Sequence, residues 1–139
     1  MSTFSLYEPG TENIKPEALS TEAEKIAQEI VGKYGNQSDT SSTQLRRFYY
    51  EFKALEKKLE KEPDRFQTKI LPLVQMVRSK VAYAKGSKKI QDAFANFLEG
   101  KVKEIKEVTH FRAFLLQFEA VVGFFYEKEQ QKKSTGRRR

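Results

Sequence analysis

The chain has 139 residues, a hydrophobic fraction of 38% and a net charge of +7, values typical of one soluble domain. It lacks cysteine, which excludes disulfide frameworks, thiolate metal sites and cysteine nucleophiles. No apolar run approaches the ~20 residues that span a bilayer, and residues 1–10 do not resemble a secretory signal, so we expect a cytoplasmic protein without a membrane segment.

The first expected elements lie in an acidic part of the chain. Residues 1–19 contain prolines and a glycine with little periodicity, which predicts a flexible N-terminal tail. Ser20 has the character of a helix N-cap, and apolar residues then recur at helical spacing as far as Tyr34. We expect Gly35 to end this helix before a polar linker over residues 36–42.

Two further helices are predicted on either side of Pro63. The second helix begins at Ser42 or Thr43, and its apolar residues advance by three or four positions to form one stripe. Pro63 ends it, and a third apolar stripe follows. Pro72 lies inside that stripe, so the third helix either begins near Leu71 or is kinked there.

Gly86 is expected to end the third helix, because glycine is the residue most often found just after a helix. The fourth helix then carries apolar residues from Ile90 onward. The last helix begins at Thr109 or His110 and runs to about Gln131 with a strongly aromatic stripe. No alternating strand pattern accompanies these helices.

The predicted fold class is therefore all-α, with about five helices in a compact helical bundle and a mobile N-terminal segment. We predict a flexible tail over residues 1–19, one helical bundle domain over residues 20–131 and a basic flexible tail over residues 132–139. No internal repeat is visible at the periods of solenoid proteins.

The sequence contains no arrangement typical of catalysis. His110 is the only histidine, and its place at a helix start favours a capping or surface role. Carboxylates such as Glu56 and Glu60 lie on a lysine-rich helix, where they are typical of i,i+4 ion pairs. No glycine-rich phosphate loop is present. We expect a protein that is not an enzyme and that uses no metal and no cofactor.

The second helix has a basic side. Seven acidic residues outnumber three lysines in residues 1–42, so the positive charge lies in the rest of the chain. Opposite the apolar stripe of the second helix lie six cations and one tyrosine: Arg46, Arg47, Tyr50, Lys53, Lys57, Lys58 and Lys61. Guanidinium groups bind phosphates and tyrosine stacks on unpaired bases, which favours nucleic acid. The alternative is a solvated helix with Glu–Lys pairs, which suits residues 56–62 better than residues 46–53.

A second cationic cluster is predicted around the end of the third helix. Arg78 and Lys85 project from the same side two turns apart, and further lysines lie at its edge and after Gly86. For Tyr83, on a flank of this helix, packing inside the protein is the favoured interpretation. The predicted nucleic-acid-binding set comprises Arg46, Arg47, Lys53, Arg78, Lys80, Lys85, Lys88 and Lys89.

The last helix has small and apolar residues on two sides. Besides its aromatic stripe it carries a second set, on roughly the opposite side, which we predict to be a protein interface: Ala113, Leu116, Ala120, Gly123 and Phe124. Self-association or contact with a neighbouring subunit is the favoured interpretation. Complete burial of both sides within the monomer is the alternative.

Three sequence blocks together resemble the small helical subunit of type III-A CRISPR–Cas (Csm) effector complexes. They are STQLRRFY at residues 42–49, KVAYAKG at residues 80–86 and FLLQFEAVVGF at residues 114–124. Each block is weakly specific by itself, and their order and spacing over residues 42–126 carry the resemblance. Where many relatives follow the second block with an arginine, this chain has Ser87, and a neighbouring lysine cannot reproduce a bidentate arginine contact.

The resemblance implies a non-catalytic RNA-binding and scaffold subunit that functions in antiviral defence. It implies crRNA and target RNA, both as single-stranded RNA, as partners that the chain contacts through the backbone without sequence preference. It further implies association with the backbone and large Csm subunits, which hold the nuclease activities. The phosphate-facing residues on this interpretation would be Arg46, Arg47, Arg78, Lys80 and Lys85.

Two alternatives remain open at this point. The chain would be a purely structural protein–protein adaptor if its lysines served only solubility. A duplex-DNA-binding protein is the less favoured alternative, because no polar recognition helix stands out.

Overall fold

The computed structural model describes residues 4–32 and 42–137, with residues 132–137 described as backbone only. Within these ranges it contains no strand, and its five α-helices are α1 (Thr21–Val31), α2 (Ser42–Lys61), α3 (Leu71–Gly86), α4 (Asp92–Glu104) and α5 (Val108–Arg137). The predicted all-α class with about five helices is confirmed.

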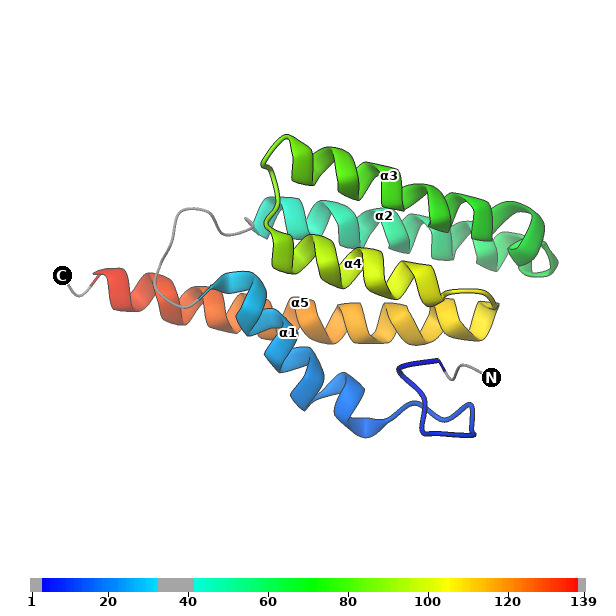
Figure 1. Cartoon of the computed structure of the whole chain (residues 1–139), viewed down its shortest axis with the longest axis horizontal. Coiled ribbons are helices and arrows are strands. Elements are labelled where there is room, and N and C mark those ends of the chain that lie inside the picture. Colours follow the sequence, from blue (N-terminus) through cyan, green and yellow to red (C-terminus); the bar gives the residue numbers. More distant parts are fainter. Residues whose placement is uncertain (1–3, 33–41, 138–139) are drawn as a thin grey trace.

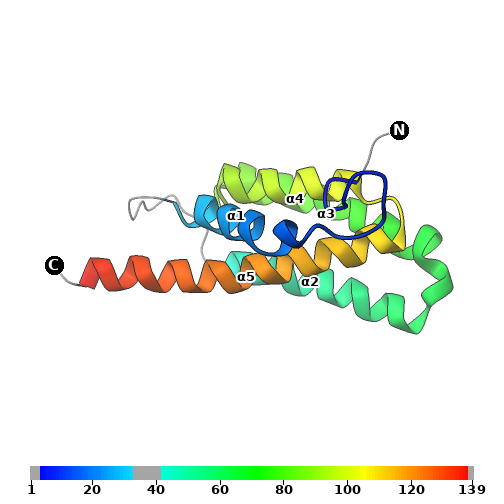
Figure 2. The ribbon, with the colours of Figure 1, turned by 90° about the horizontal axis from the view of Figure 1, so that it is seen from below.

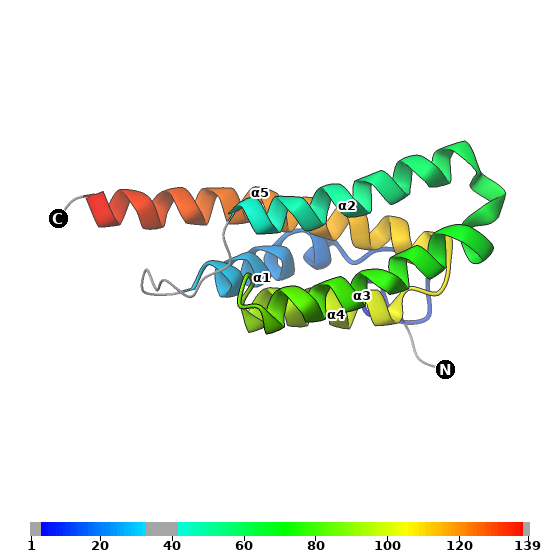
Figure 3. The ribbon, with the colours of Figure 1, turned by 90° about the horizontal axis from the view of Figure 1, so that it is seen from above.

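The long helix α5 is the axis of the bundle (Figure 1). Helices α1 and α2 pack along it, and α3 packs against α4. Seen from below, α1 lies over α5, whose C-terminal end projects beyond the other helices (Figure 2). From above, α2 and α3 diverge from a joint at one end of the molecule (Figure 3). This arrangement places α2 and α3 on the opposite side of the bundle from α1.

An aromatic cluster forms the centre of the core. Phe52, Phe94 and Phe114 are fully buried together with Phe118. The ring of Phe118 lies 6.1 Å from that of Phe52, 6.0 Å from that of Phe94 and 5.8 Å from that of Phe114. Tilted and edge-to-face contacts of this kind are the favoured geometry for aromatic pairs. The predicted apolar stripes of α2, α4 and α5 therefore meet in one core.

The joint between α2 and α3 contains two short irregular helices. A 3-10 turn spans Pro63–Arg65 and a π-helical turn spans Phe66–Ile70. Pro72 has no amide hydrogen to donate, so it is tolerated in the first turn of a helix but not in its interior. Accordingly α3 begins at Leu71, and the backbone N–H of Leu71 still donates to the carbonyl of Phe66. Of the two possibilities predicted at Pro72, a helix start is confirmed.

Helix α1 ends at Val31, and Gly32 after it has a φ of 87°. This left-handed conformation suits glycine and directs the chain away from the helix axis. The predicted stop at Gly35 lies outside the described residues. So does the predicted linker over residues 36–42, except for Ser42, which is the first residue of α2.

The end of α3 differs from the expectation at Gly86. The helix continues through Gly86, and Lys88 takes the left-handed conformation with a φ of 62°. The N–H of Lys88 donates to the carbonyl of Lys85 at 3.0 Å, and the N–H of Lys89 donates to that of Ala84 at 2.9 Å. These two bonds form a Schellman motif, which satisfies the last carbonyls of a helix. Two lysines therefore lie in the turn that leads to α4.

Residues 4–19 pack against the start of α5. Phe4, Leu6 and Tyr7 form a small second cluster with Ala18 of the 3-10 turn and Ala113 of α5. The side-chain amide of Gln117 donates to the carbonyl of Ala18 at 2.8 Å. The sequence predicts a flexible tail over residues 1–19, and the structure adds a docked position for residues 4–19. Their contacts come from an irregular segment without helical periodicity, which is why the sequence pattern does not reveal them.

The residues Val108–Gln131 of α5 are long and apolar enough to cross a membrane by length and composition alone. The core helix of a soluble protein meets the same criterion, and 44% of the apolar window is buried inside the bundle. Packing in the bundle therefore accounts for part of its apolar composition, and this helix does not indicate a membrane protein.

Candidate nucleic-acid interface

A groove between α2 and α3 brings three of the predicted cations together. Arg47 comes from α2, Lys80 from α3 and Lys89 from the turn after α3. The groove has a cavity volume of about 490 Å³. We call it the α2–α3 groove, and its lining residues are Gln44, Arg47, Phe48, Glu51, Ser79, Lys80, Tyr83, Ala84 and Lys89.

Helical periodicity explains why these side chains meet. Leu45, Phe48 and Phe52 of α2 are buried in the core, which places Arg47 on the flank of α2 that borders α3. On α3, Val77, Val81 and Ala84 are buried, and Lys80 borders that stripe. The α2–α3 groove therefore lies along the edge of two amphipathic helices whose apolar sides share one core.

One ion pair joins the two walls of the groove. The ammonium of Lys80 donates to Oε2 of Glu51 at 2.7 Å. Both side chains remain partly exposed, so this pair contributes at most about 1 kcal/mol to stability. In the part of the chain that the structure describes, Arg47 and Lys89 form no ion pair. The groove is therefore lined by three cations and one carboxylate, Glu51, which is paired with Lys80.

Tyr83 lies at the α2–α3 groove with 72% of its surface exposed. The sequence favoured packing of this ring inside the protein, and the structure corrects that interpretation. Tyr83 lies two residues after the buried Val81, and two residues correspond to a rotation of about 200° around a helix. A helical wheel of α3 could thus have identified Tyr83 as an exposed groove residue.

Two other predicted cations lie on the side of α2 that borders α5. Arg46 lines a hollow of about 350 Å³ together with Val122, Gly123 and Tyr126 of α5. Lys53 pairs with Glu56 at 2.6 Å, and this hydrogen bond raises the pKa of the Lys53 ammonium above its ordinary value. Arg46 and Lys53 therefore do not line the α2–α3 groove.

The remaining predicted cations border α4. A guanidinium nitrogen of Arg78 lies 3.6 Å from a carboxylate oxygen of Glu99, and Lys85 lies 3.8 Å from Asp92. Lys88 is exposed in the turn. The eight predicted residues therefore do not share one face. Three of them line the α2–α3 groove, and the others flank α5, flank α4 or lie in the turn.

The residues predicted as a protein interface are distributed unevenly. Ala113 is 1% exposed, because residues 4–18 already cover it within the chain. Ala120 and Phe124 are half-buried against the core, whereas Leu116 and Gly123 are exposed. An interface on α5 stays a prediction, and its accessible part is centred on Leu116 and Gly123.

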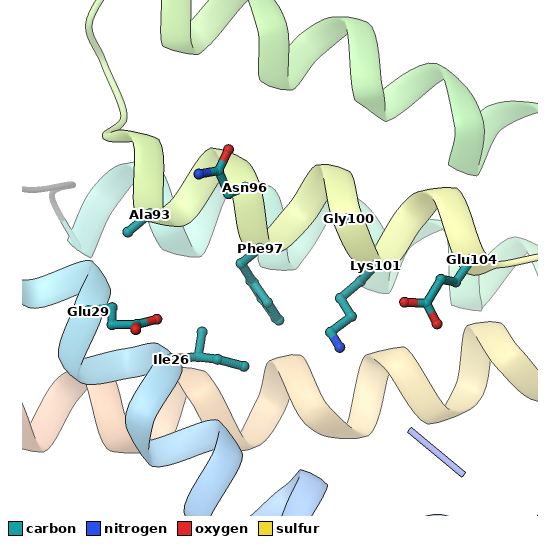
Figure 4. Close-up of a pocket in the computed structure, with 8 residues that line it drawn as sticks. All are labelled: Ile26, Glu29, Ala93, Asn96, Phe97, Gly100, Lys101 and Glu104. Atoms are coloured by element: carbon teal, nitrogen blue, oxygen red, sulfur yellow. The ribbon is translucent and has the colours of Figure 1, made fainter. Parts of the chain in front are cut away.

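A second hollow, of about 650 Å³, lies between α1 and α4 (Figure 4). Ile26 and Phe97 provide its apolar part, and its charged residues are Glu29, Lys101 and Glu104. Lys101 donates a hydrogen bond to the hydroxyl of Ser5, which in turn donates to Glu104. Its one lysine is thus engaged and its two carboxylates repel anions, so this hollow does not suit a phosphate chain.

His110 lies at the start of α5, as the sequence indicates. Its Nδ1 accepts a hydrogen bond from the backbone N–H of Lys106 at 3.2 Å, which joins the start of α5 to the turn before it. Its ring stacks on Phe4 with centroids 4.2 Å apart. Across residues 4–32 and 42–137, no group of three or more metal-ligating side chains is found.

The fold and the α2–α3 groove define a small helical-bundle protein with an exposed cationic groove. Comparison with protein families is more specific: the model of the family described as Csm2 Type III-A matches residues 13–131. The match covers most of the chain, and the chain belongs to this family. Comparison with curated proteins and with solved structures gave no significant match.

Family membership places the chain among the structural small subunits of type III-A CRISPR–Cas effector complexes, and it implies assembly with other Csm subunits. The resemblance inferred from three sequence blocks is thereby confirmed. The match also extends beyond the predicted family-like region of residues 42–126 toward the N-terminus.

Proposed function

We propose that this chain is a non-catalytic RNA-binding and scaffold subunit of a type III-A effector, acting in the cytoplasm in antiviral defence. The observation that carries the proposal is the α2–α3 groove, where Arg47 and Lys89 have no ion-pair partner among the described residues. Its partners would be the crRNA and the target RNA, together with the backbone and large Csm subunits.

Cations on an open groove act on the phosphate backbone. Arginine and lysine that contact phosphates fix the position of a nucleic acid but carry no information about its bases. Guide–target base pairing would supply sequence recognition, as in other RNA-guided complexes. We therefore expect similar affinity for RNAs of unrelated sequence.

The scaffold role would use the accessible part of α5. Leu116 is 46% exposed there, and Gly123 allows another chain to approach the helix closely. An exposed leucine by itself needs no explanation, but it continues the half-buried surface of Ala120 and Phe124. This surface is where we expect a neighbouring subunit or a second copy to bind.

A purely structural adaptor is the second candidate function. It is favoured by the internal ion pairs of Lys53, Arg78, Lys80 and Lys85, which offset four of the eight predicted cations. In such an adaptor the cations would maintain solubility and α5 would make the only functional contacts.

The deciding experiment is the fluorescence anisotropy of a labelled single-stranded RNA of ~30 nucleotides, titrated with the full chain across a salt series. Each phosphate contact contributes about −0.7 to the slope of log affinity against log salt. We expect the Arg47→Glu/Lys89→Glu variant to bind more weakly and to reduce the slope by about 1.4.

The matched control is Lys103→Glu/Lys106→Glu, which makes the same change in net charge at exposed lysines outside the groove. Equal losses in both variants would mean that affinity follows net charge alone and would contradict a specific groove. An absence of salt-dependent binding by the unmodified chain would overturn the RNA-binding proposal in favour of the adaptor.

A further inference from the structure

Tyr83 is the most exposed large hydrophobic side chain in the described part of the protein, at 72%. Its ring contacts no other aromatic ring there, and the hydrogen bonds to its carbonyl at the end of α3 involve the backbone of Tyr83 and not its ring. Folding therefore gains little from this ring. An aromatic ring in such a position is free to contact a ligand.

The surroundings of Tyr83 indicate which ligand would fit. Arg47 and Lys89 line the same groove and have no ion-pair partner among the described residues. An exposed aromatic ring that shares a groove with two cations matches a nucleotide, because the base has an aromatic face and the phosphates on its two sides are anionic. The cavity of about 490 Å³ leaves the ring open to solvent.

We propose that Tyr83 is a stacking platform for one unpaired nucleobase, with Arg47 and Lys89 holding the phosphates on either side of it. This inference rests on the proposed RNA-binding function and adds a preference to it. Bases inside a continuous helix present their faces to one another, so a stacking site selects a nucleotide that is bulged, flipped out or single-stranded. The groove would therefore distinguish an interrupted duplex from a perfect one without reading its sequence.

Two other exposed tyrosines lack this combination. Tyr50 is 64% exposed on α2 and lies beside the ring of Tyr49 at 5.8 Å, outside the groove. Tyr126 is 53% exposed in the hollow on α5, where Arg46 is the only cation. The sequence had considered Tyr50 for base stacking. Of these three tyrosines, Tyr83 is the one that lines a hollow together with two cations that have no ion-pair partner among the described residues.

The test compares two RNA duplexes that are identical except for one bulged 2-aminopurine. Binding of the full chain is measured by anisotropy, and stacking is followed by the emission of the 2-aminopurine. Loss of one base–aromatic stack lowers affinity by about 5-fold to about 150-fold. We expect Tyr83→Leu to lose that much affinity for the bulged duplex only, together with the emission change. Tyr83→Phe should retain both.

Tyr50→Leu is the matched control, because it removes an equally accessible ring outside the groove. Circular dichroism and the melting temperature verify that each variant is folded. We expect both variants to fold, because both rings are exposed and contribute little to the core. If the unmodified chain binds both duplexes equally and Arg47→Glu/Lys89→Glu weakens both, RNA binding stands and the stacking proposal is overturned. Equal loss by Tyr83→Leu on both duplexes would also overturn it. If the unmodified chain binds neither duplex, the proposed function itself fails.

Discussion

Lys88 adopts the left-handed conformation at the end of α3, with a φ of 62°. A side chain in this region costs roughly 1–2 kcal/mol relative to glycine, because the Cβ approaches the following carbonyl oxygen. Two backbone hydrogen bonds compensate by satisfying the carbonyls of Ala84 and Lys85. The chain thus retains a lysine at a position that glycine occupies in most helix ends of this type.

Replacing Lys88 by glycine should therefore stabilise the protein. We expect Lys88→Gly to raise the free energy of unfolding by about 1 kcal/mol, measured by urea denaturation. Lys89→Gly is the matched control, since Lys89 does not have a positive φ and glycine there only adds freedom to the unfolded chain. A destabilised Lys88→Gly variant would contradict the proposed strain. An accompanying loss of RNA affinity would indicate that Lys88 contacts phosphate.

Single residues also show how the structure redistributes the predicted cations. Arg46 and Arg47 are adjacent in the sequence, yet Arg46 borders α5 and Arg47 lines the α2–α3 groove. Neighbouring residues on a helix point about 100° apart, so a basic dipeptide divides its charge between two surfaces when both flanks of the helix are packed. For this reason the basic side predicted on α2 is not one binding face.

At the scale of elements, the segment 4–19 is a separate layer on α5. Its cluster of Phe4, Leu6, Tyr7, Ala18 and Ala113 does not merge with the aromatic core. Ser5 of the segment is hydrogen-bonded to Glu104 and Lys101 of α4. Gln117 holds the segment to α5 by one further hydrogen bond, while its other amide atom, Oε1, is buried without a partner in the described structure. An unsatisfied buried oxygen weakens this attachment relative to the core. We infer that the segment opens at lower free energy than the bundle.

Leu6→Ala tests this difference, because Leu6 is fully buried in the small cluster. Truncation of a buried leucine costs about 2–5 kcal/mol, and here the loss should fall on the docking of the segment alone. The N–H of Lys15 donates to the carbonyl of Leu6 at 2.8 Å, so its hydrogen-exchange rate should rise steeply in the variant. The amides of α5 should keep their protection.

Leu98→Ala, in the main core, should by contrast reduce protection throughout the bundle. Equal acceleration of the Lys15 and α5 amides in Leu6→Ala would show that the segment unfolds with the bundle.

At the scale of the whole molecule, one aromatic cluster holds three helices together. Phe118 of α5 contacts the rings of Tyr49 and Phe52 from α2, and those of Phe94 and Phe97 from α4. The α2–α3 groove depends on this cluster, because α2 is held against the bundle mainly through α5. The stability of the core and the geometry of the groove are therefore linked.

Phe118→Ala should lower the free energy of unfolding by about 3–5 kcal/mol and the melting temperature by at least about 10 °C. The removed ring leaves a cavity among side chains that cannot all collapse onto it. Thermal unfolding followed by circular dichroism measures the change. Tyr126→Ala, on the exposed side of the same helix, should change stability by less than about 0.5 kcal/mol. Similar effects of the two substitutions would contradict the central role of Phe118.

The pattern of the sequence by itself determined the helical class, the approximate helix positions and the family. Periodicity alone identifies an amphipathic helix, because the spacing of apolar residues along the chain sets the stripe that must be buried. For this reason α2 and the stripe of α5 agree with the structure, whereas the choice between a helix start and a kink at Pro72 needed the structure. The family resemblance also depended only on residue order and spacing.

Only the tertiary structure decided which charges and which apolar surfaces remain accessible. Docking of residues 4–19 covers Ala113, and the approach of α3 to α2 separates Arg47 from Arg46. Packing also brings the exposed Tyr83 into one groove with two cations, Arg47 and Lys89, that lie more than forty residues apart in the sequence. Such groupings arise from contacts between distant segments, and a one-dimensional pattern contains no information on which flank of a helix its neighbours will occupy. The helices therefore follow from local periodicity, whereas the candidate site follows from their packing.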